Sequence, residues 1–232
     1  MKNKNGSHVG MIASFSIFIL FLIAIYFIVQ PTVKNQKDKQ LILDYLKLKV
    51  QEQLSANLTT LVISNSSINP NSCIFFNKND SGLNNGNFYV KDKNGNTLEF
   101  GNNVNPTYLD VNWNGQQNFV KIFSSEEKFN TNSFSCGVFT SVSNYTIKSI
   151  VKEKQFFETR IVNGITNFLD LKNNITVTQG NDWNMDFEYN NGTIISSGVI
   201  DTLREVYSEE IPIVYVDKNA SLLSGKLRIK VW

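Results

Sequence analysis

The first long pattern in the chain is a run of apolar residues close to its N-terminus. Met11–Val29 contains no charged residue, and Ser14 and Ser16 are its strongly polar side chains. At a rise of about 1.5 Å per residue, a helix of this length approaches the ~30 Å hydrocarbon thickness of a bilayer. We therefore expect a transmembrane helix over residues 11–30, preceded by a short tail formed by residues 1–10.

A cleavable secretory signal peptide is the alternative interpretation of this run. The apolar region of a signal peptide usually has about 7–15 residues and ends at a cleavage site with small residues. The run here is longer, and the chain continues as Gln30-Pro31-Thr32-Val33 without such a site. This comparison favours a retained membrane anchor.

A second helical pattern follows the apolar run. Over Asn35–Ile63 the apolar residues recur every three or four positions, at Leu43, Leu46, Val50, Leu54, Leu58 and Leu61. We assign residues 31–63 to an amphipathic stalk helix, with an ordinary core helix of the head as the alternative. Pro31 lacks an amide hydrogen, so we expect it to kink or break the helix near the membrane surface.

Beyond Pro70 the pattern changes to short strands separated by turns, which predicts a β-rich head over residues 70–232. Asn-Gly pairs between alternating segments are strong hairpin signals. They predict three hairpins: Asn87–Asp92 with Thr97–Phe100, Tyr108–Trp113 with Gln117–Phe123, and Asp186–Tyr189 with Thr193–Ser196. Further strands are expected near Ser133–Ser141 and Thr146–Ile150, and a closing pair at Glu210–Val216 and Lys226–Val231.

One internal helix interrupts these strands in the prediction. Val151–Leu171 has Phe157, Ile161, Ile165 and Phe168 on one helical face, and Gly164 weakens this assignment slightly. The predicted fold class is therefore α+β: a long N-terminal transmembrane and stalk helix, followed by an antiparallel β-rich head with one internal helix.

Charge is distributed unevenly between the two parts of the chain. Residues 1–69 carry seven lysines and three acids, whereas residues 70–232 carry fifteen basic and seventeen acidic residues that are scattered. Nucleic-acid binding requires clustered basic side chains to neutralise phosphates. We therefore expect no nucleic-acid partner.

The 32 asparagines, with many Ser and Thr and few charges, suit a surface outside the cytoplasm, although an AT-rich genome would also enrich Asn.

The sulfur chemistry is limited to two cysteines, Cys73 and Cys136, apart from the methionines. Their spacing excludes a CxxC redox motif, and His8 is the single histidine, so a zinc site lacks ligands. In an exported domain the two cysteines would form one disulfide. Two buried free cysteines are the alternative in a reducing compartment.

Catalytic and metal-binding patterns give no assignment. Nucleophile–base chemistry usually recruits histidine, and His8 precedes the anchor. Asp182, Asp186 and Glu188 cluster around Trp183 and leave a glycosidase-type carboxylate pair open. Oxygen ligands are offered by Asp80, Asp92, Asp182 and Asp186, without EF-hand spacing. We predict no enzyme, no cofactor and no metal site.

The orientation of the anchor is not given by charge, because Lys2 and Lys4 precede it while Lys34, Lys37 and Lys39 follow it. Long C-terminal domains are translocated largely regardless of charge. We expect the head to lie outside the cytoplasm. Seven N-x-S/T sequons beyond the apolar run agree with export, although chance alone gives nearly as many: Asn57, Asn65, Asn79, Asn144, Asn174, Asn191 and Asn219.

A basic tail with Gly6, an uninterrupted apolar helix, a helical stalk and a β-rich head resemble archaeal type IV pilin-like proteins with a class III signal peptide. In that family a prepilin-type peptidase cuts ahead of the hydrophobic helix. The resemblance implies that Gly6 precedes the cut and Ser7 becomes the new N-terminus, with Gly10 as a second candidate. It also implies that the helices bundle into a filament core. Asn5 stands where the family usually has a charged residue.

The expected function is that of a pilin-like structural or adhesive cell-surface subunit. The alternative is a single-pass, membrane-anchored, extracytoplasmic binding domain of a surface complex that does not polymerise. The expected partners are membrane lipid and either further copies of the chain or other envelope proteins.

Overall fold

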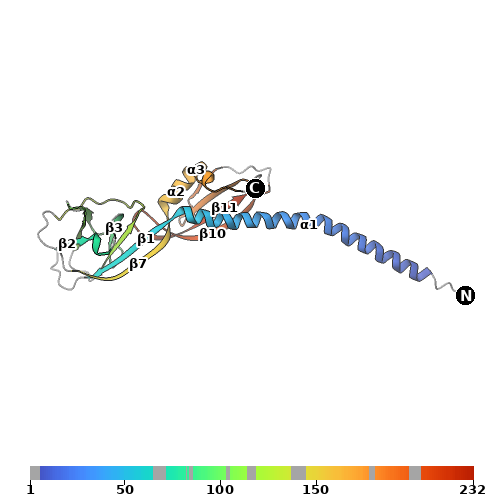
Figure 1. Ribbon diagram of the computed structural model, residues 1–232, viewed down its shortest axis with the longest axis horizontal. Helices are drawn as coiled ribbons and strands as arrows, with labels where there is room; N and C mark the ends of the chain where they lie inside the picture. Colours follow the sequence, from blue (N-terminus) through green and yellow to red (C-terminus); the bar gives the residue numbers. More distant parts are fainter. Residues whose placement is uncertain are drawn as a thin grey trace.

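The computed structural model describes residues 6–64, 72–81, 83, 86–102, 105–113, 119–136, 145–177, 181–198 and 205–232. A single long helix projects from an elongated head made of strands and two short helices (Figure 1). The chain is thus an α+β protein, as the sequence predicts. Its helices are α1 (Gly6–Leu54), α2 (Glu158–Thr166) and α3 (Phe168–Asn174), with a 3₁₀ turn at Lys78–Ser81.

Helix α1 differs from the prediction at its C-terminal end, and of the kink or break expected at Pro31 the break does not occur. It continues through Pro31 without a break, and it bends between its free end and the head (Figure 1). A long helix can absorb the hydrogen bond lost at a proline by bending. The helix also ends at Leu54, so the stalk helix predicted to reach Ile63 is too long. Leu58 and Leu61 lie instead in strand β1 (Ser55–Ser64), where Thr, Val and Ile favour an extended backbone.

The large sheet has eight strands in the order β3-β6-β1-β7-β10-β11-β8-β9. These strands span Asn87–Asp92 (β3), Phe119–Ser125 (β6), Thr146–Phe157 (β7), Tyr207–Val216 (β10), Leu222–Val231 (β11), Trp183–Tyr189 (β8) and Ile194–Ser196 (β9). Neighbours are antiparallel except β7 and β10, whose ends pair in parallel through Tyr215–Val216 and Phe156–Phe157. The predicted all-antiparallel sheet is therefore wrong at this one short contact.

A second, three-stranded sheet has the order β2-β5-β4, formed by Ser72–Asn77, Tyr108–Trp113 and Phe100–Asn102. This sheet corrects the predicted pairing of Tyr108–Trp113 with Gln117–Phe123. Both segments form strands, but β5 pairs with β2 and β4, while β6 pairs with β1 and β3. The Asn114-Gly115 connection lies outside the described residues.

One predicted hairpin and the predicted closing pair are confirmed. Strands β8 and β9 pair around Asn190-Asn191-Gly192, and β10 pairs with β11 along its whole length. The hairpin after β3 is confirmed only in part. Asp92 Oδ1 accepts the backbone N–H groups of Asn94 and Asn96 at 2.7 and 2.9 Å, which closes the turn. Beyond a single bridge from Thr97 to Lys91, the chain leaves to form β4.

The helix predicted at Val151–Leu171 begins later than expected. Strand β7 continues to Phe157, because its pairing with β1 extends to Phe156. The remaining residues form α2 and α3, separated at Asn167. Gly164 has a packing role, since a Cβ added there would lie 2.8 Å from Cδ2 of Leu54.

The strand expected near Ser133–Ser141 is absent from the described part, residues 133–136; the rest lies outside the described residues.

Two hydrophobic cores lie on either side of the junction between α1 and β1. The distal core fills the space around β1, β3, β6 and the small sheet, and its largest fully buried side chains are Trp113, Phe76 and Phe157. The proximal core joins α1, α2 and α3 to β8, β10 and β11. The C-terminal part of α1 is therefore a core helix of the head, which is the alternative that the sequence left open.

Candidate functional site

The surface that most distinguishes this chain is the first half of α1. Gly10–Gln30 is free of charge, and every one of its residues is exposed in the structure. The exposed fractions of its large apolar side chains run from 38% at Ile19 to 73% at Met11 and Ile28. Water-exposed apolar surface on this scale indicates a membrane or a protein partner. The segment is long and apolar enough to cross a membrane.

At the end of this segment nearest the head, the chain has the residue types that are common where a transmembrane helix leaves the membrane. Tyr26 and Phe27 contact each other edge to face with their ring centroids 6.0 Å apart, and Lys34 and Lys37 follow within three turns. Aromatic rings favour the interfacial region, and lysines can extend their ammonium groups toward water. At the other end, Gly6 and Ser7 form the first turn of α1.

The second half of α1 is fixed to the head by one apolar stripe. Leu43, Leu46, Val50 and Leu54 are buried in the proximal core, whereas Leu48, on the other side of the helix, is 68% exposed. Burial of four such side chains stabilises the contact by roughly 1.5–3 kcal/mol each before conformational entropy is subtracted. The docked and free parts of α1 thus differ in burial and share one continuous backbone.

Polar contacts fix the same helix to the head at its flanks. Lys39 Nζ donates to Asn181 Oδ1 at 2.5 Å, and Lys47 Nζ pairs with Glu209 at 2.9 Å. The hydrogen bond and charge of Glu209 raise the pKa of Lys47 above its usual value. Both contacts are at the solvent boundary, so they orient the helix more than they stabilise it.

The transition from helix to sheet is held by Arg160, a residue of α2. Its guanidinium donates to the carbonyl oxygen of Ser55 at 2.7 Å and to Glu126 and Glu127 at 2.6 Å each. Thr159 also donates to Glu127 at 2.6 Å. Arg160 therefore joins the first residue of β1 to the segment after β6. The sequence contains no pattern that identifies it, because its partners are distant along the chain.

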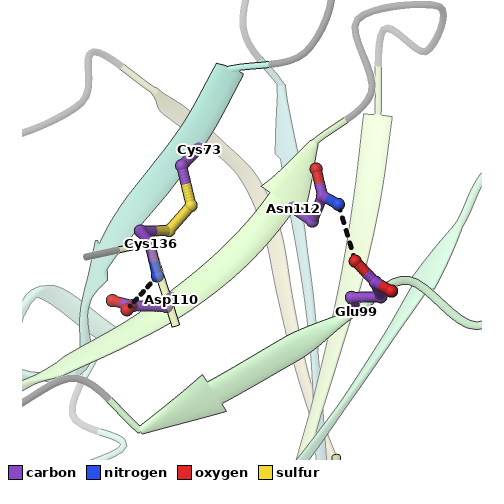
Figure 2. The surroundings of a disulfide bond; sticks show 5 residues. All are labelled: Cys73, Glu99, Asp110, Asn112 and Cys136. Atoms are coloured by element: carbon purple, nitrogen blue, oxygen red, sulfur yellow. Dashed lines mark hydrogen bonds between the residues drawn. A yellow bond between two sulfur atoms is a disulfide. The ribbon is translucent and has the colours of Figure 1, made fainter. Parts of the chain in front are cut away.

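The far end of the head is closed by the predicted disulfide between Cys73 and Cys136 (Figure 2). Their Cα atoms are 5.8 Å apart, and the sequence separation is 63 residues. The backbone N–H of Cys136 donates to Oδ2 of Asp110, a fully buried residue of β5, at 2.9 Å. On the same strand, Asn112 donates to Glu99 at 2.8 Å (Figure 2). The disulfide thus attaches the segment that follows β6 to the small sheet.

Two buried lysines, which sequence reasoning did not single out, fix loops of the distal part. Lys78 Nζ donates to Asn102 Oδ1 at 3.0 Å and to the carbonyl of Pro106 at 2.8 Å. Lys91 Nζ donates to the carbonyl of Ala220 at 3.1 Å. Burial lowers the pKa of both lysines below the usual value. A buried lysine is hard to find in a sequence because lysine is normally a surface residue.

The acids that suggested a carboxylate pair are each engaged with a basic side chain. The ion pairs are Lys172–Asp182, Lys230–Asp186 and Arg228–Glu188. Asp186 also accepts a hydrogen bond from Ser196 at 2.6 Å. Trp183 is buried and packs edge-on against Phe168, with the centroids 4.8 Å apart. Each of the three acids is therefore paired with a base, Asp186 in a buried position, while Trp183 belongs to the proximal core.

The metal-ligand candidates are also dispersed. Asp92 closes the turn after β3, Asp182 and Asp186 are in ion pairs, and the side chain of Asp80 lies outside the described residues. Within the described part of the chain, no three His, Cys, Asp or Glu side chains are grouped so that they could hold a metal ion.

The fold and the surface define an α+β protein with an exposed apolar helix and a head that contains a disulfide. Comparison with protein-family models, curated proteins and solved structures gives no match for this chain.

Proposed function

We propose that the chain is a membrane-anchored cell-surface protein of pilin-like construction, with its head outside the cytoplasm. The observation that carries this proposal is the division of α1: Gly10–Gln30 is apolar and exposed, while Leu43–Leu54 lies in the core of the head. If the apolar half of such a helix is inserted in a membrane, its docked half keeps the folded head at the membrane surface. The disulfide supports an oxidising location for the head.

The expected location can be tested by protease accessibility. Trypsin added to intact spheroplasts should digest the head, because Lys93 and Lys218 lie exposed in turns. A cytoplasmic marker protein should remain intact in the same sample, and both should be digested after detergent is added. Protection of the head together with the marker would show the opposite orientation.

The pilin-like part of the proposal predicts processing at the N-terminus. Intact-mass measurement of the protein extracted from membranes should give an N-terminus at Ser7, or at Met11 if Gly10 precedes the cut. Gly6→Val should leave Met1 in place by blocking a cut after Gly6. Gly10→Val separates the two candidate sites, because it should block only a cut after Gly10, and an added Cβ meets no atom within 4 Å there. An unprocessed N-terminus in the wild-type protein would contradict the pilin-like reading.

A non-polymerising anchored binding domain is the second candidate, and one observation favours it. Asp38 is the first acidic residue of the chain, so Ser7–Gln30 contains no carboxylate. A new terminal amine inside a bundle of apolar helices would lack an anionic partner from its own apolar segment, and an unpaired buried charge is costly. Immunogold electron microscopy with antibodies to the head separates the candidates: labelled filaments support the first, and an even envelope label the second.

A further inference from the structure

Five of the seven sequons beyond the apolar run lie in the described part of the chain, and the structure distinguishes them. An N-glycosylation acceptor needs an accessible asparagine amide and a Ser or Thr two residues later, usually in a surface loop. The described acceptors are Asn57, Asn79, Asn174, Asn191 and Asn219, and all five asparagines are exposed. The accessibility and hydrogen bonds of the residues that follow each asparagine are therefore decisive.

The sequon at Asn57 lies within the large sheet. Asn57 and Thr59 belong to β1, and both are paired with residues of β7. Leu58, the residue between them, is 2% exposed. A transferase could not bind this tripeptide without removing a central strand from the sheet.

Two other sequons have a buried middle residue. After Asn174, Ile175 is 2% exposed at the end of α3. After Asn219, Ala220 is 5% exposed and has a φ of 50°. Asn219 Oδ1 also accepts the amide of Asn130 at 2.7 Å. In both cases, binding of the tripeptide by an enzyme would disturb the head.

The sequon at Asn79 is wound into the 3₁₀ turn Lys78–Ser81. The preceding residue, Lys78, is buried, and its hydrogen bonds to Asn102 and Pro106 hold this turn against the small sheet. The backbone of the tripeptide is therefore fixed in a helical form and cannot adopt an extended or open-turn form locally.

The sequon at Asn191 differs from these four. Asn191, Gly192 and Thr193 are all exposed at the tip of the β8–β9 hairpin, and Gly192 has a φ of 82°, which glycine adopts readily. Asn191 Oδ1 accepts the backbone N–H of Thr193 at 3.0 Å. This contact holds the side-chain amide across the turn toward the Thr residue, while its nitrogen bonds to no other described residue.

We propose that Asn191 is an N-glycosylation site of the head, and the one that is modified among the five described sequons. This inference rests on the proposed extracytoplasmic location, because saccharide transfer takes place on that side of the membrane. The co-reactant is a saccharide linked through phosphate to a lipid carrier. Asn191 Nδ2 forms a bond to the anomeric carbon, and the bond from that carbon to the phosphate oxygen breaks. The lipid phosphate leaves with the electron pair, and one amide proton passes to a base of the transferase.

Mass spectrometry of the full-length protein from its own membranes tests the proposal. Trypsin alone is insufficient, because cleavage after Lys172 and Arg204 leaves Asn174 and Asn191 on one peptide. A second cleavage after Phe187 or Tyr189 by chymotrypsin separates them. The fragment with Asn191 is expected to carry the saccharide, and the fragments with Asn57, Asn79, Asn174 and Asn219 are expected to be unmodified.

Matched variants give the controls. Asn191→Gln and Thr193→Ala should both remove the modification, whereas Thr193→Ser and Asn219→Gln should retain it. An unmodified Asn191 in a head that external protease digests would overturn this inference alone. Saccharide on Asn57, Asn79, Asn174 or Asn219 in place of Asn191 would overturn the structural selection. A protease-protected head without saccharide would overturn this inference and the proposed location together.

Discussion

Leu46→Ala is expected to lower the free energy of unfolding by about 2–5 kcal/mol. The Leu46 side chain is 0% exposed, and it lies at the centre of the stripe that fixes α1 to the proximal core. Its truncation removes buried apolar contacts and leaves a cavity between the helix and the sheet. Denaturant unfolding of the full-length protein in detergent, followed by tryptophan fluorescence, measures the effect, because Trp183 belongs to the same core.

Leu48→Ala is the matched control for this experiment. Leu48 lies two residues later on the same helix and is 68% exposed, so its truncation should change stability by no more than about 0.5 kcal/mol. The two variants remove the same atoms from residues of equal helix propensity. Equal losses of stability would contradict the docking of α1 through the Leu43–Leu54 stripe.

Removal of the disulfide by Cys73→Ser with Cys136→Ser is expected to cost about 4 kcal/mol in the chain-entropy model. The closed loop is long, with a sequence separation of 63 residues, so the crosslink strongly restricts the unfolded chain. The same denaturant measurement should show the loss, and trypsin should cut the distal part of the head faster. Reduction of the wild-type protein should reproduce the effect.

The double-serine variant also provides the control for reduction, since a reductant should leave its stability unchanged. Alkylation in denaturant without reductant gives an independent measurement, because it also reaches buried thiols. The wild-type protein purified without reductant should show no reactive thiol. Two alkylated cysteines in that sample, or a stability that does not respond to reduction, would contradict the crosslink.

Local signals in the sequence were sufficient for those elements whose structure depends on near neighbours. The apolar helix follows from an uninterrupted run, and the β8–β9 hairpin follows from Asn-Gly between alternating segments. Leu58 and Leu61 show the limit of such signals. Their spacing fits a helix, yet pairing with β6 and β7 places them in a strand. The pairing of β7 with β1 also explains why Val151–Phe157, predicted as helix, forms part of a strand.

The candidate site was predictable to a similar degree. The exposed apolar segment and the two cysteines could be identified because composition alone marks them. The contacts of Arg160 with Ser55, Glu126 and Glu127 could not, because three separate parts of the chain meet there only after the sheet has formed. Strands β5 (Tyr108–Trp113) and β6 follow each other in the chain but belong to different sheets. This arrangement depends on how the two sheets pack and not on the turn that connects the strands.

The direct passage from α1 into β1 has a mechanical consequence. Ser55 follows Leu54 without a linker, and β1 runs on from the helix toward the far end of the head (Figure 1). Along its length β1 is hydrogen-bonded to β7 over ten paired positions and to β6 over seven. A pull between the free end of α1 and the far end of the head therefore loads these ladders in shear. Their hydrogen bonds resist together and do not open one at a time, so the head can carry tension while it remains folded.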